Sequence, residues 1–386
     1  MKIFYFSGTK LPSQKSESVH VMKMGQAFSK AGHDVTLFAK GVNGAASEDI
    51  FKIYDTEIGF KLYLSSQLGI PLLSSAKRLI GFKNKIAQLP QPDLTYGHDP
   101  IELFLFSPEN TPIIFEVHQM PALSAHRWAF SKLIKQPNCK AIIAVSDVLK
   151  RDILKAFPEL EPEDIFVAHD GADLIDHITS NATGEALLKG RKDAFKVGYA
   201  GSLNPGKGMA MISRIAKLRP EYDFHVLGGT RKQVQNYQTH NRLPNIHYYG
   251  HRDHADVAKY LNVFDIAIAP YQHRALIKTG RNMSRWISPM KIFEYMAAKK
   301  PILCSDLEVI HEILEHEKTA LLLPAGDEEK WAEAIDILHD HSDFKNELAH
   351  NAYESLRDKY TWDKRIQAIM EFGFEERASI RMFRAS

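Results

Sequence analysis

Short apolar runs alternate with helical stretches along this chain of 386 residues, and the whole alternation occurs twice. The first series predicts strands at residues 3–6, 35–39, 113–117, 141–145 and 165–168, with a helix over residues 18–30. The second series predicts strands at residues 195–200, 223–227, 246–249, 265–269, 301–304 and 320–323. Strands separated by helices form βαβ units, so both halves should contain a parallel sheet with ligands at the carboxyl ends of its strands.

A polar stretch over residues 178–192 interrupts the alternation and is predicted to be a linker. A chain of 386 residues is also long for one core. We therefore expect an α/β protein with two Rossmann-like domains facing each other across a cleft. The predicted bounds are residues 1–178 for the first domain and 190–365 for the second.

Composition excludes several classes of protein. The net charge is +2, so overall charge does not favour nucleic-acid binding. The two cysteines, Cys139 and Cys304, are expected to be free thiols in a reducing compartment, and no Cys/His group has zinc-site spacing. The first residues are predicted to form a strand and not a signal peptide, and no apolar run is long enough to cross a bilayer. A cytoplasmic protein without a bound metal or cofactor is the expectation.

Residues 288–306 carry the most specific chemistry, in the order SPMKIFEYMAAKKPILCSD. They predict a polar loop, an amphipathic helix and a short apolar strand. Lys291 and Glu294 lie three positions apart, so they share one face near the helix start. Backbone N–H groups at a helix start favour anions. A phosphate on the amides and Lys291, with ribose hydroxyls on Glu294, is the ligand that suits this segment.

The turn at residues 201–208, GSLNPGKG, follows a predicted strand and precedes a helix. It nearly fits a P-loop, but Gly208 stands where the magnesium-binding hydroxyl would be. It does not fit the G-x-G-x-x-G pattern of dinucleotide-binding proteins either. The third interpretation is a loop whose amides after Gly201 and whose Lys207 bind a diphosphate.

Both segments resemble family 4 glycosyltransferases, which have the GT-B fold. The loop matches their G-[RS]-L-x-x-x-K-G pattern, in which the resemblance implies that Gly201, Ser202 and Lys207 contact the donor diphosphate. Many relatives have Arg at the position of Ser202. The resemblance further implies that the end of the chain, residues 366–386, forms a helix that returns to the N-terminal domain.

The second segment matches the family's donor-binding block. The resemblance implies that Ser288, Pro289, Met290 and Lys291 bind the donor and that Glu294 holds the ribose hydroxyls. Many relatives carry a second glutamate eight positions earlier, where this chain has Trp286. Arg274, Arg281 and Arg285 are further cations that could neutralise the leaving group.

The N-terminal half supplies further candidates. His118 follows the predicted strand at residues 113–117, and the resemblance implies that it lies beside the donor sugar at the reacting centre. Asp99 is another candidate at a strand end. Lys15, Ser16 and Ser18 lie in a loop where relatives contact phosphate. Two interpretations remain for this loop: a contact with phosphate or acceptor, and an ordinary solvated loop.

A stretch without acidic residues, 58–91, includes the basic residues from Lys77 to Lys85 interleaved with apolar ones. This pattern fits a helix resting on anionic lipid, and it also fits an ordinary helix covering the sheet.

The resemblance implies a metal-independent, retaining glycosyltransferase that moves a hexose-type sugar from a UDP or GDP sugar to a hydroxyl acceptor in glycan or glycolipid synthesis. Lys207, Lys291 and His118 are the predicted catalytic residues. Two alternatives remain: a nucleotide-sugar epimerase that uses Asp99 and Glu116 as acids, and a non-catalytic partner that binds a nucleotide sugar.

Overall fold

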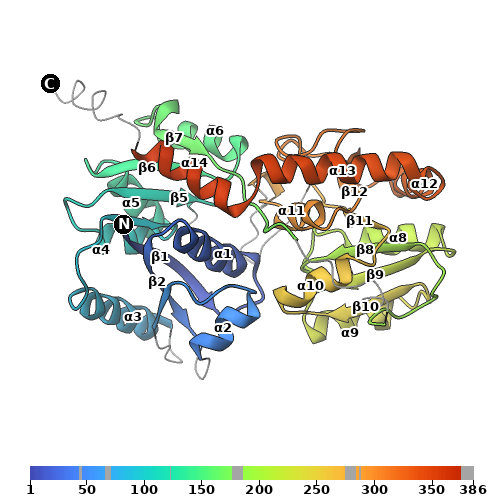
Figure 1. Cartoon of the computed structure of the whole chain (residues 1–386), viewed down its shortest axis with the longest axis horizontal. Helices are drawn as coiled ribbons and strands as arrows, with labels where there is room; N and C mark the ends of the chain where they lie inside the picture. Colours follow the sequence, from blue (N-terminus) through green and yellow to red (C-terminus); the bar gives the residue numbers. More distant parts are fainter. Residues whose placement is uncertain are drawn as a thin grey trace. The chain divides into compact units, whose positions relative to one another are not determined.

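The computed structural model describes residues 1–42, 46–65, 71–121, 123–175, 186–273, 284–286 and 288–374. The chain forms two compact units, each with its own sheet (Figure 1). Residues 1–169 and 362–386 make up the N-terminal unit, and residues 170–361 make up the C-terminal unit.

The N-terminal unit is built on a parallel sheet with the strand order β3-β2-β1-β4-β5-β6-β7. The strands are β1 (Lys2–Leu11), β2 (Asp34–Gly41), β3 (Lys61–Ser65), β4 (Leu94–Gly97), β5 (Ile113–Val117), β6 (Cys139–Ala144) and β7 (Ile165–Val167). After β3 the chain returns to place β4 beside β1, so the carboxyl ends of β1 and β4 form the point where strand order reverses. Ligands of open α/β sheets bind at such points.

Helices cover this sheet. They are α1 (Ser16–Lys30), α2 (Ser47–Ile53), α3 (Pro71–Ile86), α4 (Pro100–Phe106), α5 (Ser124–Leu133), α6 (Asp147–Ala156), the short 3₁₀ helix η1 (Pro162–Asp164) and α14 (Trp362–Phe374). Helix α14, the red helix beside α1 in Figure 1, brings the end of the described chain back to the first sheet. Ile366 and Ile369 are buried, and Phe372 stacks on Phe166 with ring centroids 4.9 Å apart. The predicted return of the C-terminal helix is therefore confirmed up to residue 374; residues 375–386 lie outside the described part.

The C-terminal unit has a second parallel sheet, ordered β10-β9-β8-β11-β12-β13. Its strands are β8 (Lys196–Ala200), β9 (Asp223–Leu227), β10 (Ile246–Gly250), β11 (Ile266–Ala269), β12 (Ile302–Ser305) and β13 (Leu321–Leu323). Its helices are α8 (Met209–Leu218), α9 (Arg231–His240), α10 (His254–Leu261), η2 (Ser284–Trp286), α11 (Met290–Ala297), α12 (Glu328–Asp340) and α13 (Ser342–Lys359). Strand order reverses here between β8 and β11.

The two-sheet prediction is confirmed, and the predicted strands coincide with observed ones to within a few residues at their ends. Strands β3 and β4 have no counterpart among the predicted strand ranges. The sequence of β3, KLYLS, lies inside the stretch considered as a basic amphipathic segment. Helix α1, predicted over residues 18–30, is buried almost all round from His20 to Phe28. The sheet lies on one side of α1, and α14 packs on another.

The boundary between the units differs from the predicted one. Residues near 170 belong with the C-terminal unit because they pair with its last residues: Ala172 N donates to Tyr360 O at 3.1 Å, and Ala172 forms a bridge with Thr361. A Cβ on Gly171 would lie 2.3 Å from Tyr360 O, so this close approach requires glycine. The predicted linker at 178–192 lies partly outside the described residues.

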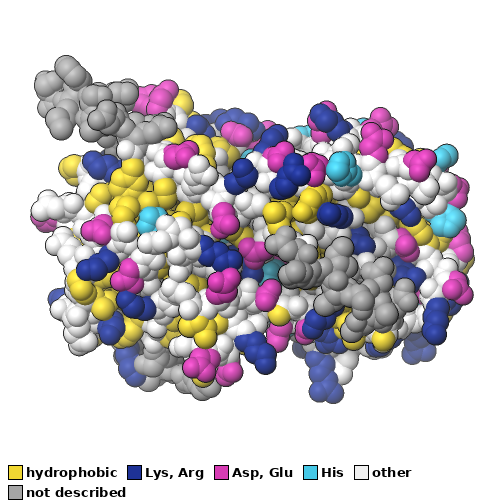
Figure 2. Space-filling model, in the orientation of Figure 1, with side chains coloured by type: hydrophobic (Ala, Val, Ile, Leu, Met, Phe, Trp, Pro, Cys, Tyr) yellow, Lys and Arg dark blue, Asp and Glu magenta, His cyan; other side chains and the backbone are white. Residues whose placement is uncertain are grey.

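Basic and acidic side chains are interspersed on the face shown in Figure 2, in keeping with the net charge of +2. Among the helices that the structure describes, none is long and apolar enough to cross a membrane.

Candidate functional site

The loop between β8 and α8 lies at the reversal point of the C-terminal sheet. Gly201 has φ +152° and Gly208 has φ +100°, backbone conformations that side chains disfavour. A Cβ on Gly201 would lie 2.6 Å from Lys291 Nζ, and one on Gly208 would lie 2.3 Å from Pro270 O. The glycines therefore let the loop approach both α11 and the end of β11. This brings Gly201 next to Lys291, two residues that the sequence predicts to share one ligand.

Lys291 lies in the first turn of α11, and its Nζ is buried without a hydrogen-bond partner among the described residues. The amine lies 3.7 Å from the ring centroid of Tyr199 and 5.2 Å from that of Tyr271. Burial, and then the neighbouring Lys207, hold its pKa well below the ordinary range. Because buried amines are normally paired, this amine is suited to bind an anion.

Lys207 approaches Tyr271 as well, with Nζ 5.2 Å from the ring centroid. Burial lowers its pKa to about 8. Two amines with lowered pKa values thus lie close to one aromatic ring, that of Tyr271, near the carboxyl ends of β8 and β11. The structure brings together Gly201, Lys207 and Lys291 as the sequence predicts.

Buried tyrosines fix the backbone around these lysines. Ala200 N donates to the Tyr295 hydroxyl at 2.8 Å, and Tyr199 donates to Ser202 O at 2.7 Å. Ser202 itself is exposed. Cys304 lies behind the site, fully buried, and burial raises its pKa to about 12, so it remains a thiol. No motif or spacing in the sequence singles out these tyrosines.

The other residues predicted to bind the donor lie in α11 or just before it. Glu294 is partly exposed, and its Oε1 lies 3.5 Å from His254 Nδ1 at the start of α10. Ser288 donates a hydrogen bond to the buried Asp170, while Pro289 and Met290 are buried. Pro289 and Met290 therefore support the helix start, and Ser288 anchors the segment to residue 170.

Of the other predicted cations, Arg285 lies in the described part of the chain and contacts a different group. Arg285 lies 3.4 Å from Glu308, and both side chains are exposed. Arg274 and Arg281 lie outside the described residues.

In the N-terminal unit, His118 belongs to a network centred on Glu116, which is fully buried. Oε1 of Glu116 lies 2.6 Å from Arg365 Nη2, 3.2 Å from His20 Nε2 and 3.0 Å from His118 Nε2. The Tyr96 hydroxyl donates to Oε2. Burial acts to raise the pKa of Glu116, but Arg365 and the two imidazoles hold it well below the ordinary range. Arg365 comes from α14, 249 positions along the chain from Glu116, and no sequence signal connects the two residues.

The remaining N-terminal candidates make mostly local contacts. Asp99 caps α4, accepting from Ile101 N at 3.0 Å and Glu102 N at 3.1 Å. Ser18 is buried, and its hydroxyl donates to Lys15 O at 2.6 Å. Lys15 and Ser16 are exposed at the start of α1, which leaves them accessible to a ligand.

Two family models match the chain. "Glycosyltransferase Family 4" matches residues 18–175, and "Glycosyl transferases group 1" matches residues 194–341. Together with the two-sheet fold, these matches define a glycosyltransferase of the GT-B type. The chain belongs to the family 4, or group 1, glycosyltransferases.

Individual known proteins also resemble this chain. YtcC of Bacillus subtilis (strain 168), named as a glycosyltransferase, is 24% identical over 70% of this chain and 70% of its own length. TuaH of the same organism, named as a teichuronic acid biosynthesis glycosyltransferase, is 30% identical over 33% of this chain, and the match spans only 30% of TuaH. Anabaena Alr3699/HepE, solved in complex with UDP-glucose, superposes with a TM-score of 0.70 over 96% of this chain and 98% of HepE, at 16% identity. At that identity the likeness shows the fold alone.

Proposed function

We propose that this chain is a retaining glycosyltransferase that transfers a sugar from a nucleoside diphosphate sugar to a hydroxyl acceptor without a metal ion. The main evidence is the buried amine of Lys291, which lies next to Gly201 and has no hydrogen-bond partner among the described residues, with the amine of Lys207 close to the same Tyr271 ring. Two amines that converge beside glycine amides suit a diphosphate, whose charge would stabilise their protonated forms.

The leaving diphosphate develops negative charge as the glycosidic bond breaks, and we propose that Lys207 and Lys291 neutralise it. Stabilisation of developing charge by groups held at fixed positions is usually the main source of an enzyme's rate enhancement. The two lysines would supply the charge that a divalent ion could otherwise provide. A donor phosphate oxygen would take the proton of the acceptor hydroxyl.

Glu294 would accept hydrogen bonds from the ribose hydroxyls, since its carboxylate is partly exposed one helical turn from Lys291. His118, partly exposed and held from behind by Glu116, would orient the donor sugar. UDP is our first choice of donor nucleotide, because the similarly folded HepE was solved with UDP-glucose; GDP is the second. The name of TuaH motivates a place in bacterial glycan synthesis.

The epimerase alternative requires acidic groups that can exchange protons with a substrate. Asp99 caps α4, and Glu116 is bound by Arg365 and Tyr96, so both carboxyl groups have structural partners. This favours a transferase over an epimerase.

We also propose that the protein is cytoplasmic and contacts a membrane only at its surface. Both cysteines are buried free thiols, as expected of a cytoplasmic protein. In α3, Phe82 is buried, and Arg78 pairs with the buried Glu102, so part of the basic stretch covers the sheet. Lys77, Ile80 and Lys83 are exposed, and we propose them as the face that would contact anionic lipid peripherally.

The test is thermal stabilisation of the EDTA-treated protein by UDP, GDP, ADP and their sugar conjugates, followed by a transfer assay. A selective rise in melting temperature with one base would support the donor site, and NMR of the product would show whether the anomeric configuration is retained. Lys207→Ala should lower turnover by at least about tenfold, because a hydrogen bond to a charged group contributes about 1.5–3 kcal/mol. Binding without transfer or donor hydrolysis would instead indicate the non-catalytic partner.

A further inference from the structure

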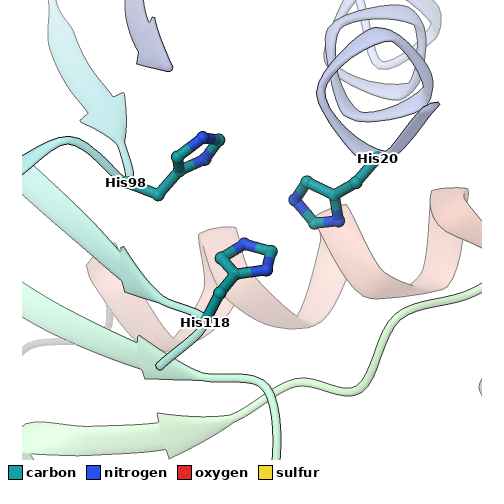
Figure 3. A group of neighbouring side chains, drawn as sticks. All are labelled: His20, His98 and His118. Carbon is teal, nitrogen blue, oxygen red and sulfur yellow. The ribbon is translucent and has the colours of Figure 1, made fainter. Parts of the chain in front are cut away.

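Three imidazoles converge in the N-terminal unit near the carboxyl ends of its strands (Figure 3). His20 lies in α1, His98 directly follows β4, and His118 directly follows β5. One nitrogen from each ring lies within 4.8 Å of the other two. The ring centroids of His20 and His118 are 4.5 Å apart, and those of His98 and His118 are 5.1 Å apart.

The cluster has a closed side and an open side. The side chains of His20 and His98 are 1% and 8% exposed, whereas that of His118 is 24% exposed. An ion could therefore enter past His118 and be held against the two buried rings.

Each of the three imidazoles offers a ring nitrogen that can bind a metal ion. The Nδ1 atom of His98 is buried and has no hydrogen-bond partner among the described residues. Buried polar atoms normally have a hydrogen-bond partner. Three clustered imidazoles with at least one unpartnered nitrogen therefore suggest a role beyond packing of the core.

The carboxylates of Glu116 and Glu17 lie close to nitrogens of these rings. Glu116 Oε1 lies 3.2 Å from His20 Nε2 and 3.0 Å from His118 Nε2. Glu17 Oε1 lies 3.8 Å from His98 Nε2, which also contacts Thr9 Oγ1 at 3.2 Å. Metal-bound histidines are usually oriented by such groups. Glu17 and Glu116 thus place negative charge close to the rings, where it would attract a cation, although Arg365 and Lys15 offset part of it.

The spacing is wide but within reach of an ion. Zinc–nitrogen bonds of about 2.1 Å in a tetrahedral site place ligand nitrogens about 3.4 Å apart. The nitrogens lie at most 4.8 Å apart, and rotation of the imidazole rings can supply the shifts that bring them to that value. Neutral imidazoles prefer zinc, copper, nickel and cobalt over magnesium or calcium.

We propose that His20, His98 and His118 form a binding site for one divalent transition-metal ion of the zinc class, and that a bound ion inhibits the enzyme by engaging His118. Metal binding does not depend on the proposed function, whereas the inhibition rests on it. The site is regulatory in this proposal and takes no part in sugar transfer, so the reaction itself remains metal-independent.

The test uses the full chain, treated with EDTA and then desalted, with Zn²⁺ as the ligand in isothermal titration calorimetry. We expect one ion per chain, and His98→Gln should weaken binding at least about 100-fold, because even altering the groups that orient metal ligands costs 10–100-fold in affinity. His350→Gln, an exposed histidine on α13, is the matched control and should bind as the wild type does. Equal affinity in wild type and His98→Gln, or no stoichiometric binding to the wild type, would overturn the proposal.

Two further readouts separate metal binding from inhibition. Co²⁺ should quench Trp362 fluorescence, because the indole lies 5.5 Å from the His20 ring, and His98→Gln should abolish the effect. If His98→Gln does not fold, His20→Gln takes its place in both experiments.

Zn²⁺ should inhibit wild-type transfer, with recovery on adding EDTA, and should leave the transfer rate of His98→Gln unchanged. Binding without inhibition would refute the regulatory part. A chain that binds zinc but never transfers sugar would refute the proposed function and leave the metal site standing.

Discussion

Replacing Lys291 with methionine should have opposite effects on stability and on donor binding. Lys291→Met removes a buried amine that has no hydrogen-bond partner among the described residues and keeps nearly the same length of side chain. An unsatisfied buried polar group costs about 1–3 kcal/mol. The ring of Tyr199, 3.7 Å from Nζ, offsets part of that cost, since a cation–π contact contributes about 0.5–2 kcal/mol.

The expected net result is a gain of about 1 kcal/mol in the free energy of unfolding of the ligand-free protein. For a domain of this size, that gain corresponds to roughly 2–4 °C in melting temperature. Donor binding should weaken at the same time by about 10- to 100-fold, because one charge-assisted contact of about 1.5–3 kcal/mol is lost.

The assay is differential scanning calorimetry with and without UDP, together with titration calorimetry for the dissociation constant. Lys217→Met is the control, because Lys217 is exposed on the neighbouring helix α8 and should affect neither quantity. A variant that binds UDP as tightly as the wild type would remove Lys291 from the donor site. A variant that is clearly destabilised would show that the amine already has a favourable partner in the absence of ligand.

Three further predictions concern separate parts of the chain. UDP affinity should fall by up to roughly tenfold per pH unit as pH rises through about 8, because the pKa of Lys207 lies near that value in the free protein and only the protonated amine attracts phosphate; a Lys207→Met variant with the same pH profile would contradict this. Glu294→Ala should raise the donor KM about tenfold or more with little change in kcat, as expected when hydrogen bonds to a charged group are lost in ground state and transition state alike; a normal KM in steady-state kinetics would mean that the ribose is held elsewhere. Arg365→Met should lower the free energy of unfolding in urea by about 3–5 kcal/mol, because it leaves the charge of Glu116 buried without its guanidinium partner, whereas the same change at the exposed Arg357 should have little effect; equal losses in the two variants would argue against the network.

Much of the fold could be predicted because parallel α/β sheets leave local signals. The apolar runs at residues 113–117 and 223–227 coincide with β5 and β9, and glycine and lysine at 201–208 mark a loop that must approach other backbone closely. The edge strand β3 was harder to predict, because a half-exposed strand carries a weaker apolar pattern than a buried one.

The candidate donor site could be predicted for a related reason. Lys291 and Glu294 are fixed relative to each other by one helix, and Gly201 and Lys207 by one loop. Each pair needs only local geometry, and strand order then brings the pairs together at the β8–β11 reversal. The tyrosines around the lysines carry no such local mark, since a buried tyrosine in a strand usually serves only the core.

The sequence by itself thus determined the class of fold, the number of sheets and the segments that supply Lys207 and Lys291, because these depend on periodicity and on residues close together in the chain. Only the tertiary structure decided which residues far apart in the chain lie close enough to interact. Arg365 reaches Glu116 because α14 returns to the first sheet. His20, His98 and His118 converge because the start of α1 meets the carboxyl ends of β4 and β5 at one edge of the sheet. The pKa values of Lys207 and Lys291 were likewise decided there, since burial is a property of the packed chain and not of any one segment.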